Sequence, residues 1–252
     1  MIMLMPSQLC HAVLAVALAV PCLAFAQSGA VTTRLSQFSY ELVDLDLDDG
    51  ISPAVQFVLK SHSLRSAYAS NTHLVDEDVG TEMGTTAIAG PSGSAGSSLS
   101  TDTWFSHATT RFGPSDYEFY SAYAFTTWSY TLTPGTALSL RVLAEHTRNP
   151  APEVDLYVDA RLTGRLYGSD GGWLGSIDHY YWGEDESGFS WLEGTVASGT
   201  GTATGELVLG VASYAYTSPA AVPEPATGLM SLAGLGVVFA VARRRKACQA
   251  DR

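Results

Sequence analysis

Tyr117-Glu118-Phe119-Tyr120 opens the stretch of sequence that decides the fold, which continues to Tyr130-Thr131-Leu132 and then meets Pro134-Gly135. Aromatic and β-branched residues fit the pleated surface of a sheet, so this stretch favours extended backbone. Pro followed by Gly is typical of a tight turn, and the extended segment should end there. We therefore predict one long strand or two short strands over residues 117–132.

Similar segments lie on both sides of this stretch, separated by Gly, Ser, Thr, Pro and Asn. None of them shows apolar residues at the 3.6-residue spacing of an amphipathic helix. We predict further strands over residues 43–48, 55–59, 137–145, 154–167, 173–182, 189–196 and 206–216. Many short strands without intervening helices indicate an all-β fold, an antiparallel two-sheet sandwich or jelly roll.

The alternation within these strands also predicts a core, because side chains at every second position of a strand face the same way. The residues expected between the sheets are Leu45, Phe57, Phe119, Leu140, Leu156 and Val208. Two segments rich in small residues, 84–100 and 198–205, are predicted to be loops within the domain.

Alternating carboxylates occur at Asp44, Asp46 and Asp48, directly before Asp49-Gly50. Such a pattern makes these three aspartates a weak candidate calcium site, because hard cations take several oxygen ligands. However, the glycine stands one place late for an EF-hand loop, and the twelfth position is Val55 instead of Glu. We expect the carboxylates to lie along the solvated face of a strand that ends in a turn, and we expect no metal or other cofactor.

The N-terminus has the pattern of a secretory signal peptide. Residues 11–20 are apolar, Pro21 follows, and Ala24-Phe25-Ala26 supplies the small residues that a signal peptidase requires. We predict cleavage before Gln27. The three cysteines, Cys10, Cys22 and Cys248, then fall outside the exported part, so disulfides should contribute nothing to its stability.

The C-terminus combines three features. Val222-Pro223-Glu224-Pro225 is held extended by its prolines, residues 226–242 carry no charge, and a basic block follows at Arg243, Arg244, Arg245 and Lys246. Seventeen uncharged residues reach about 25 Å as a helix, which is the short end of what spans a bilayer. Lys and Arg are retained on the cytoplasmic side, so the basic block should stop transfer there.

This tail resembles the PEP-CTERM sorting signal of Gram-negative bacteria. The resemblance implies processing by a membrane-embedded exosortase, with Pro223, Glu224 and Pro225 as the sorting motif, and export to the cell surface or beyond. The expected parts are a signal peptide (1–26), a β-sandwich domain (27–217), a linker (218–225), a transmembrane helix (226–242) and a basic cytoplasmic tail (243–252).

The exported part is strongly acidic. When the five basic and two acidic residues of the tail are set aside, 8 basic and 23 acidic residues remain, a net charge near −15. Such a charge repels nucleic acid and anionic membranes, so a nucleic acid partner is not expected.

No catalytic residue can be named from the sequence. The histidines are scattered, no Gly-x-Ser-x-Gly elbow occurs, and the acidic run at residues 184–186 has the pattern of a solvated hairpin turn. We therefore expect a protein without enzymatic activity.

The aromatic residues leave one alternative open. Trp182 and Trp191 flank the acidic hairpin and could stack on sugar rings, although most tryptophans of an aromatic sandwich are expected in the core. The first hypothesis is a non-catalytic surface or matrix protein associated with extracellular polysaccharide. The alternative is a carbohydrate-binding module or carbohydrate-active enzyme carried on the same sorting signal.

Overall fold

The computed structural model describes residues 28–111, 117–183 and 187–217. All regular elements in these ranges are β-strands, and therefore no helix long and apolar enough to cross a membrane occurs among them. The strands are β1 (Ser28–Asp44), β2 (Val55–Ser70), β3 (His73–Gly80), β4 (Gly84–Ala89), β5 (Gly93–Leu99), β6 (Trp104–Arg111), β7 (Glu118–Leu132), β8 (Thr136–Asn149), β9 (Val154–Gly168), β10 (Trp173–Gly183), β11 (Gly188–Ala197) and β12 (Ala203–Thr217).

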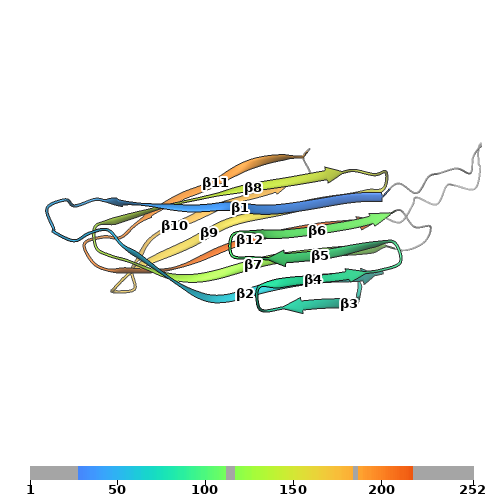
Figure 1. The fold of residues 1–252 in the computed structure, drawn as a ribbon, viewed down its shortest axis with the longest axis horizontal. Coiled ribbons are helices and arrows are strands. Elements are labelled where there is room, and N and C mark those ends of the chain that lie inside the picture. The colour runs from blue at the N-terminus through green and yellow to red at the C-terminus, as the bar shows by residue number, and fades with distance from the viewer. Residues whose placement is uncertain (1–27, 112–116, 184–186, 218–252) are drawn as a thin grey trace, which may run out of the picture.

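The strands form two sheets of six (Figure 1). Sheet A has the order β11-β8-β1-β6-β5-β4, and sheet B has the order β10-β9-β12-β7-β2-β3. All neighbouring strands are antiparallel. The prediction of an all-β two-sheet sandwich is confirmed, and the stretch 117–132 forms a single long strand, β7.

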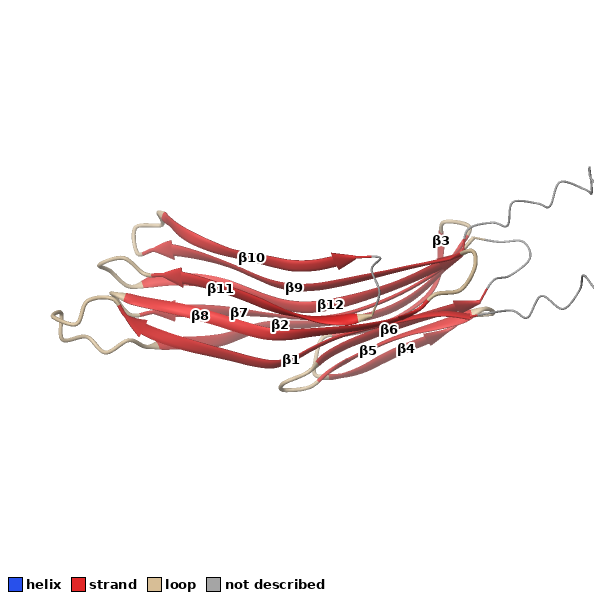
Figure 2. Cartoon of the chain, turned by 90° about the horizontal axis from the view of Figure 1, so that it is seen from above, coloured by secondary structure: helices blue, strands red, loops and turns tan. Residues whose placement is uncertain are grey.

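The strands run along the long axis of the molecule (Figures 1 and 2). The longest, β1, has 17 residues and spans about 55 Å. The two ends of the described chain meet at one end of the sandwich: Thr217 pairs with Val154, and a Cβ on Gly29 would lie 2.5 Å from a methyl group of the same valine. The connection between β1 and β2 forms the opposite tip (Figure 1).

Between the sheets, the apolar core is divided in two. Trp104 and Tyr130 belong to one cluster, and Tyr120 and Leu156 belong to the other. The inward positions between the clusters are occupied by hydroxyl residues: Thr33, Ser66, Thr86, Ser97, Ser106 and Ser213, all buried. The Ser213 hydroxyl lies 3.0 Å from that of Thr33 and 2.8 Å from that of Ser106. These buried hydroxyls are therefore hydrogen-bonded to one another across the interior.

The predicted strand over residues 43–48 is wrong beyond Asp44, where β1 ends. The Asp44 and Asp46 carboxylates accept hydrogen bonds from the backbone N–H groups of Asp46 and Asp48, at 3.0 and 3.4 Å. Aspartate side chains that bond the backbone two residues on compete with a strand ladder, so the chain turns instead. Leu45 and Leu47 are consequently 55% and 84% exposed, and Leu45 is not a core residue.

The predicted loop over residues 84–100 is also wrong, because it forms the hairpin of β4 and β5. Small side chains are required there: a Cβ on Gly96 would lie 2.4 Å from the His107 ring, and a Cβ on Gly90 would lie 2.3 Å from the Tyr120 hydroxyl. The segment 198–205 is a connection only as far as residue 202, where β12 follows.

The other core predictions divide by position. Leu140 and Leu156 are buried as expected, and Phe57 packs against the core while partly buried. Phe119 and Val208 face outward, since their neighbours on β7 and β12, Tyr120 and Leu207, occupy the inward positions. These strands are apolar on both faces, and alternation alone does not say which face is inside.

Candidate functional site

The outer face of sheet B carries a row of aromatic side chains. On β12 the residues Leu207, Leu209 and Val211 point inward, so Tyr214 and Tyr216 fall on the outer face. The strand register brings them beside outward residues of the neighbouring strands. These neighbours are Phe119 on β7, Tyr157 on β9 and Trp182 on β10.

These five rings form one connected surface, which we call the aromatic platform (Phe119, Tyr157, Trp182, Tyr214 and Tyr216). Tyr157 stacks on Tyr216 at 5.1 Å between ring centroids, and Trp182 lies 6.3 Å from Tyr157 and 6.2 Å from Tyr214. Phe119 lies 6.1 and 6.0 Å from Tyr214 and Tyr216. Ring pairs at these distances attract one another beyond their shared burial.

Two hydroxyls of the platform, those of Tyr214 and Tyr216, have raised pKa values and stay protonated at neutral pH. Burial raises the pKa of Tyr214, with the Asp159 charge adding to the effect and Arg161 opposing it. Burial also raises the pKa of Tyr216, together with a hydrogen bond that its hydroxyl donates to Tyr157. The platform therefore presents neutral hydroxyl donors beside its rings.

An ion pair lies directly beside the platform. The Arg161 guanidinium donates to the Asp159 carboxylate, which is only 2% exposed although it stands on the outer face. The same guanidinium lies 5.0 Å from the centre of the Phe125 ring. Phe125 in turn lies flat over Gly210, where a Cβ would come within 1.6 Å of the ring. These contacts hold the arginine in one orientation.

The ion pair and Trp182 line a depression on β9 and β10 of about 300 Å³, which Thr163, Asp178 and Tyr180 complete. A second depression, of about 480 Å³, shares Thr163 and Asp178 and continues along the same strands to Trp173. Together they make one groove, here called the sheet B groove, with Trp182 at one end and Trp173 at the other.

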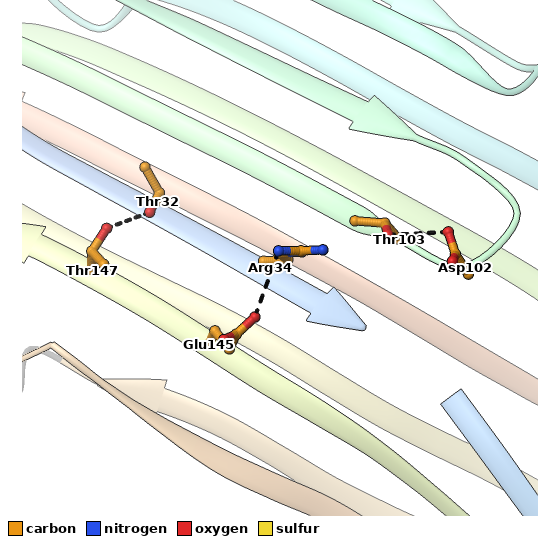
Figure 3. Close-up of polar contacts among 6 residues, drawn as sticks. All are labelled: Thr32, Arg34, Asp102, Thr103, Glu145 and Thr147. Carbon is orange, nitrogen blue, oxygen red and sulfur yellow. Dashed lines mark hydrogen bonds and ion pairs between the residues drawn. The ribbon is translucent and has the colours of Figure 1, made fainter. Parts of the chain in front are cut away.

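The outer face of sheet A has a different character (Figure 3). Thr32 on β1 is hydrogen-bonded to Thr147 on β8, and Arg34 approaches Glu145 at 3.9 Å. Arg141 and Glu193 form a further ion pair at 2.8 Å. These groups are exposed and alternate in sign, which is typical of a solvated sheet face.

The two predicted sugar-stacking residues lie on different sheets. Trp182 belongs to sheet B and faces the platform, whereas Trp191 is on β11 of sheet A, where the Arg141 guanidinium covers its ring at 3.7 Å. The structure thus places them on opposite outer faces, and it does not bring them together. Trp173 was among the tryptophans expected mostly in the core, and Tyr180, Asp159 and Arg161 were not predicted as site residues; the period-two spacing of Tyr180 and Trp182 was the signal that could have identified this face.

Of the candidate metal ligands, Asp44 ends β1, and Asp46 and Asp48 lie in the turn that follows; the first two bond the backbone as described above. Within residues 28–111, 117–183 and 187–217, no three His, Asp or Glu side chains are grouped in a way that could hold a metal ion. The acidic run 184–186, the sorting motif Pro223-Glu224-Pro225 and the basic block 243–246 lie outside the described residues.

Residues 221–246 match the PEP-CTERM protein-sorting motif. The chain therefore carries the signal of an exported protein with a membrane-anchored precursor. Among curated proteins, none shows significant sequence similarity to this chain.

Two solved structures show weak similarity. One is the N-terminal CBM22-1–CBM22-2 tandem domain of Xyn10C from Paenibacillus barcinonensis, at 9% identity and a TM-score of 0.18, with 79% of this chain and 74% of that chain covered. The other is a structure of carbohydrate-binding modules from the β-sandwich superfamily, at 8% identity and a TM-score of 0.11, with 73% and 95% covered. TM-scores this low carry no argument about fold or function.

Proposed function

We propose that this chain is a non-catalytic exported protein that an exosortase system delivers to the cell surface or the extracellular matrix, where it associates with exopolysaccharide. The observation that carries the proposal is the sorting motif at residues 221–246, which begins shortly after the last strand ends at Thr217. A signal peptidase would remove residues 1–26, and residues 226–242 would form the transmembrane helix of the precursor.

The shape of the domain supports this topology. Because β1 begins and β12 ends beside Val154, the cleaved N-terminus and the connection to the membrane helix lie at the same end of the sandwich. A chain anchored there would hold the tip at residues 45–54 farthest from the bilayer (Figure 1). The outer faces of both sheets then remain accessible along their length.

Mass spectrometry of the protein isolated from an exosortase-containing host tests the proposal. We expect a mature form that begins at Gln27 and lacks the basic block 243–246. Glu224→Ala should leave the tail in place, whereas Glu41→Ala in the sandwich should be processed normally. An intact C-terminus at Arg252 in the surface fraction would contradict the proposal.

A carbohydrate-active enzyme is the second candidate, because the end of the sheet B groove beside Trp182 contains two carboxylates, Asp159 and Asp178. Glycoside hydrolysis uses one acid and one base or nucleophile on either side of the sugar. Asp159 is already engaged by Arg161, which favours binding over catalysis. Release of reducing ends from a soluble glucan, abolished by Asp178→Asn, would establish the enzyme instead.

A further inference from the structure

We propose that the sheet B groove binds a neutral polysaccharide chain, with Trp182 and Tyr180 stacking on sugar rings at one end and Trp173 at the other. This inference rests on the proposed function, since it names the site and the class of polysaccharide through which the exported protein would associate with its matrix.

Exposure of the aromatic residues is the first support. Trp173, Tyr180 and Trp182 are 60%, 60% and 58% exposed, and all three stand on β10, the edge strand of sheet B. Large apolar surface left in water forgoes the stabilisation that burial would provide, so an exposed aromatic row indicates a ligand that covers it. The flat faces of these side chains combine apolar area with a polar N–H or O–H group, which suits a sugar ring.

The fixed polar groups are the second support. The Arg161 guanidinium lines the groove, pairs with Asp159 and lies 5.0 Å from the centre of the Phe125 ring, and these two contacts restrict its orientation. Thr163 and Asp178 line the same depression. A few oriented donors and acceptors beside flat aromatic rings are what a site needs to recognise the hydroxyls of a sugar.

Charge selects among polysaccharides. The groove is lined by two arginines, Arg161 and Arg165, and by three carboxylates, Asp159, Asp178 and Glu206. This near balance lies within an exported part whose net charge is near −15. An anionic polymer would be repelled by the whole domain, and the groove has an excess of only one carboxylate over its arginines to offer a polycation. A neutral chain is therefore the ligand that fits.

The length of the groove favours a polymer over a single sugar. Nine residues separate Trp173 from Trp182, which corresponds to about 30 Å along a strand. Both ends carry an exposed tryptophan, so a chain of several rings can contact both at once, and linked contacts strengthen one another.

Affinity electrophoresis and titration calorimetry with the mature exported protein test this inference. The probes are two soluble neutral polymers, a β-glucan and a galactomannan, with alginate as the polyanion and chitosan as the polycation. We expect retardation by at least one neutral polymer. Trp182→Ala and Trp173→Ala should each weaken binding by about tenfold or more, and the double variant should abolish it. Trp182→Tyr, which keeps a ring, should retain most of the affinity.

Trp191→Ala is the matched control, because it removes a tryptophan from the outer face of sheet A. It should bind as the unaltered protein does. Circular dichroism of each variant checks that the fold is kept. The inference is overturned if no neutral polymer binds, if binding is confined to alginate or chitosan, or if Trp191→Ala weakens binding as much as Trp182→Ala.

The two proposals fail separately. A processed surface protein that binds no neutral polymer would overturn this inference and leave the proposed sorting intact. Binding that depends on Trp182, by a protein whose tail is never removed, would overturn the proposed exosortase processing and leave the proposed polysaccharide site intact. Release of reducing ends on binding would overturn the non-catalytic part of the proposed function alone.

Discussion

The two outer faces of the sandwich are built from similar strands and differ in what they present to solvent. Sheet A presents hydroxyl pairs and exposed ion pairs, such as Thr32 with Thr147 and Arg34 with Glu145 (Figure 3). Sheet B presents the aromatic platform and a groove with a buried carboxylate. Outward side-chain pairs add to the stability of either sheet, but the strand ladder and the shared core form with both kinds of pair. The fold alone therefore does not require the aromatic character of sheet B, and the proposed binding would account for it.

Tyrosine shows the asymmetry most directly. Of the twelve tyrosines of the chain, one, Tyr40, lies on a strand of sheet A. Ten lie on strands of sheet B, where Tyr68, Tyr120, Tyr130 and Tyr181 pack in the core and the other six face outward, and Tyr117 directly precedes β7. Tyrosine and tryptophan provide large contact area with few rotatable bonds, which is why they are enriched in binding surfaces.

The largest expected effect comes from the core that both sheets share. Leu156→Ala under sheet B and Leu138→Ala under sheet A should each lower the free energy of unfolding by about 2–5 kcal/mol, since both side chains are fully buried. Leu45→Ala, at the exposed tip, should change it by less than about 0.5 kcal/mol. Urea unfolding of the purified mature protein measures all three. A marked difference between the two buried sites would mean that the faces are not supported equally.

Alkaline pH should destabilise the protein through sheet B. Burial raises the pKa of Tyr130 to about 12, while an unfolded tyrosine has a pKa of about 10. Below pH 10 both states keep the proton and stability is constant. Between pH 10 and 12 only the unfolded state releases it, so stability should fall, by about 2–3 kcal/mol at pH 12.

Melting temperatures recorded from pH 8 to 12 check this expectation. Tyr130→Phe should make the decline above pH 10 shallower, although losing the hydrogen bond to the Arg165 carbonyl costs about 1 kcal/mol at neutral pH. Tyr40→Phe on sheet A is the control and should leave the profile unchanged. An unaltered slope in the Tyr130 variant would show that other groups cause the alkaline loss.

The two ion pairs should respond differently to loss of their arginine. Arg161→Met leaves the buried Asp159 carboxylate without its guanidinium and should cost about 2 kcal/mol, less than for a fully buried pair because Arg161 is partly exposed. Arg34→Met on sheet A should cost less than about 0.5 kcal/mol, since both partners of that pair are about half exposed. If chemical denaturation gave equal losses of unfolding free energy for the two variants, the two ion pairs would not differ in stabilising the fold.

The smallest effect concerns the glycine beneath the Phe125 ring. Gly210→Ala would place a methyl group where the ring lies, and the resulting displacement should cost about 1–2 kcal/mol. Gly175→Ala on β10 is the matched control: its nearest neighbour would be a Val196 methyl group at 3.9 Å, so it should be neutral or slightly stabilising. Differential scanning calorimetry separates the two, and a neutral Gly210→Ala would show that the ring is free to move.

Local sequence determined the fold class and most of the strands. Residues 117–132, 137–145 and 206–216 carry aromatic and β-branched side chains between turn residues, and such segments can be recognised without knowledge of their partners. The sorting signal could also be recognised from sequence. Its prolines, uncharged segment and basic block each have a local chemical effect that does not depend on the rest of the fold.

Only the tertiary structure decided what the strands face and which residues meet. The sequence is compatible with Phe119 and Val208 on either side of their strands. In the structure Tyr120 and Leu207 fill the interior, so Phe119 and Val208 face outward. The hairpin of β4 and β5 needs small residues because the His107 ring lies over Gly96 on β5 and the Tyr120 hydroxyl lies over Gly90 in the connection, and both contacts come from other parts of the chain. Trp182 and Trp191 are nine residues apart in the chain but on opposite faces, because β10 and β11 belong to different sheets and do not form the hairpin that the sequence predicted. The groove itself depends on the register of β9 against β10, which is a property of paired strands and not of either sequence alone.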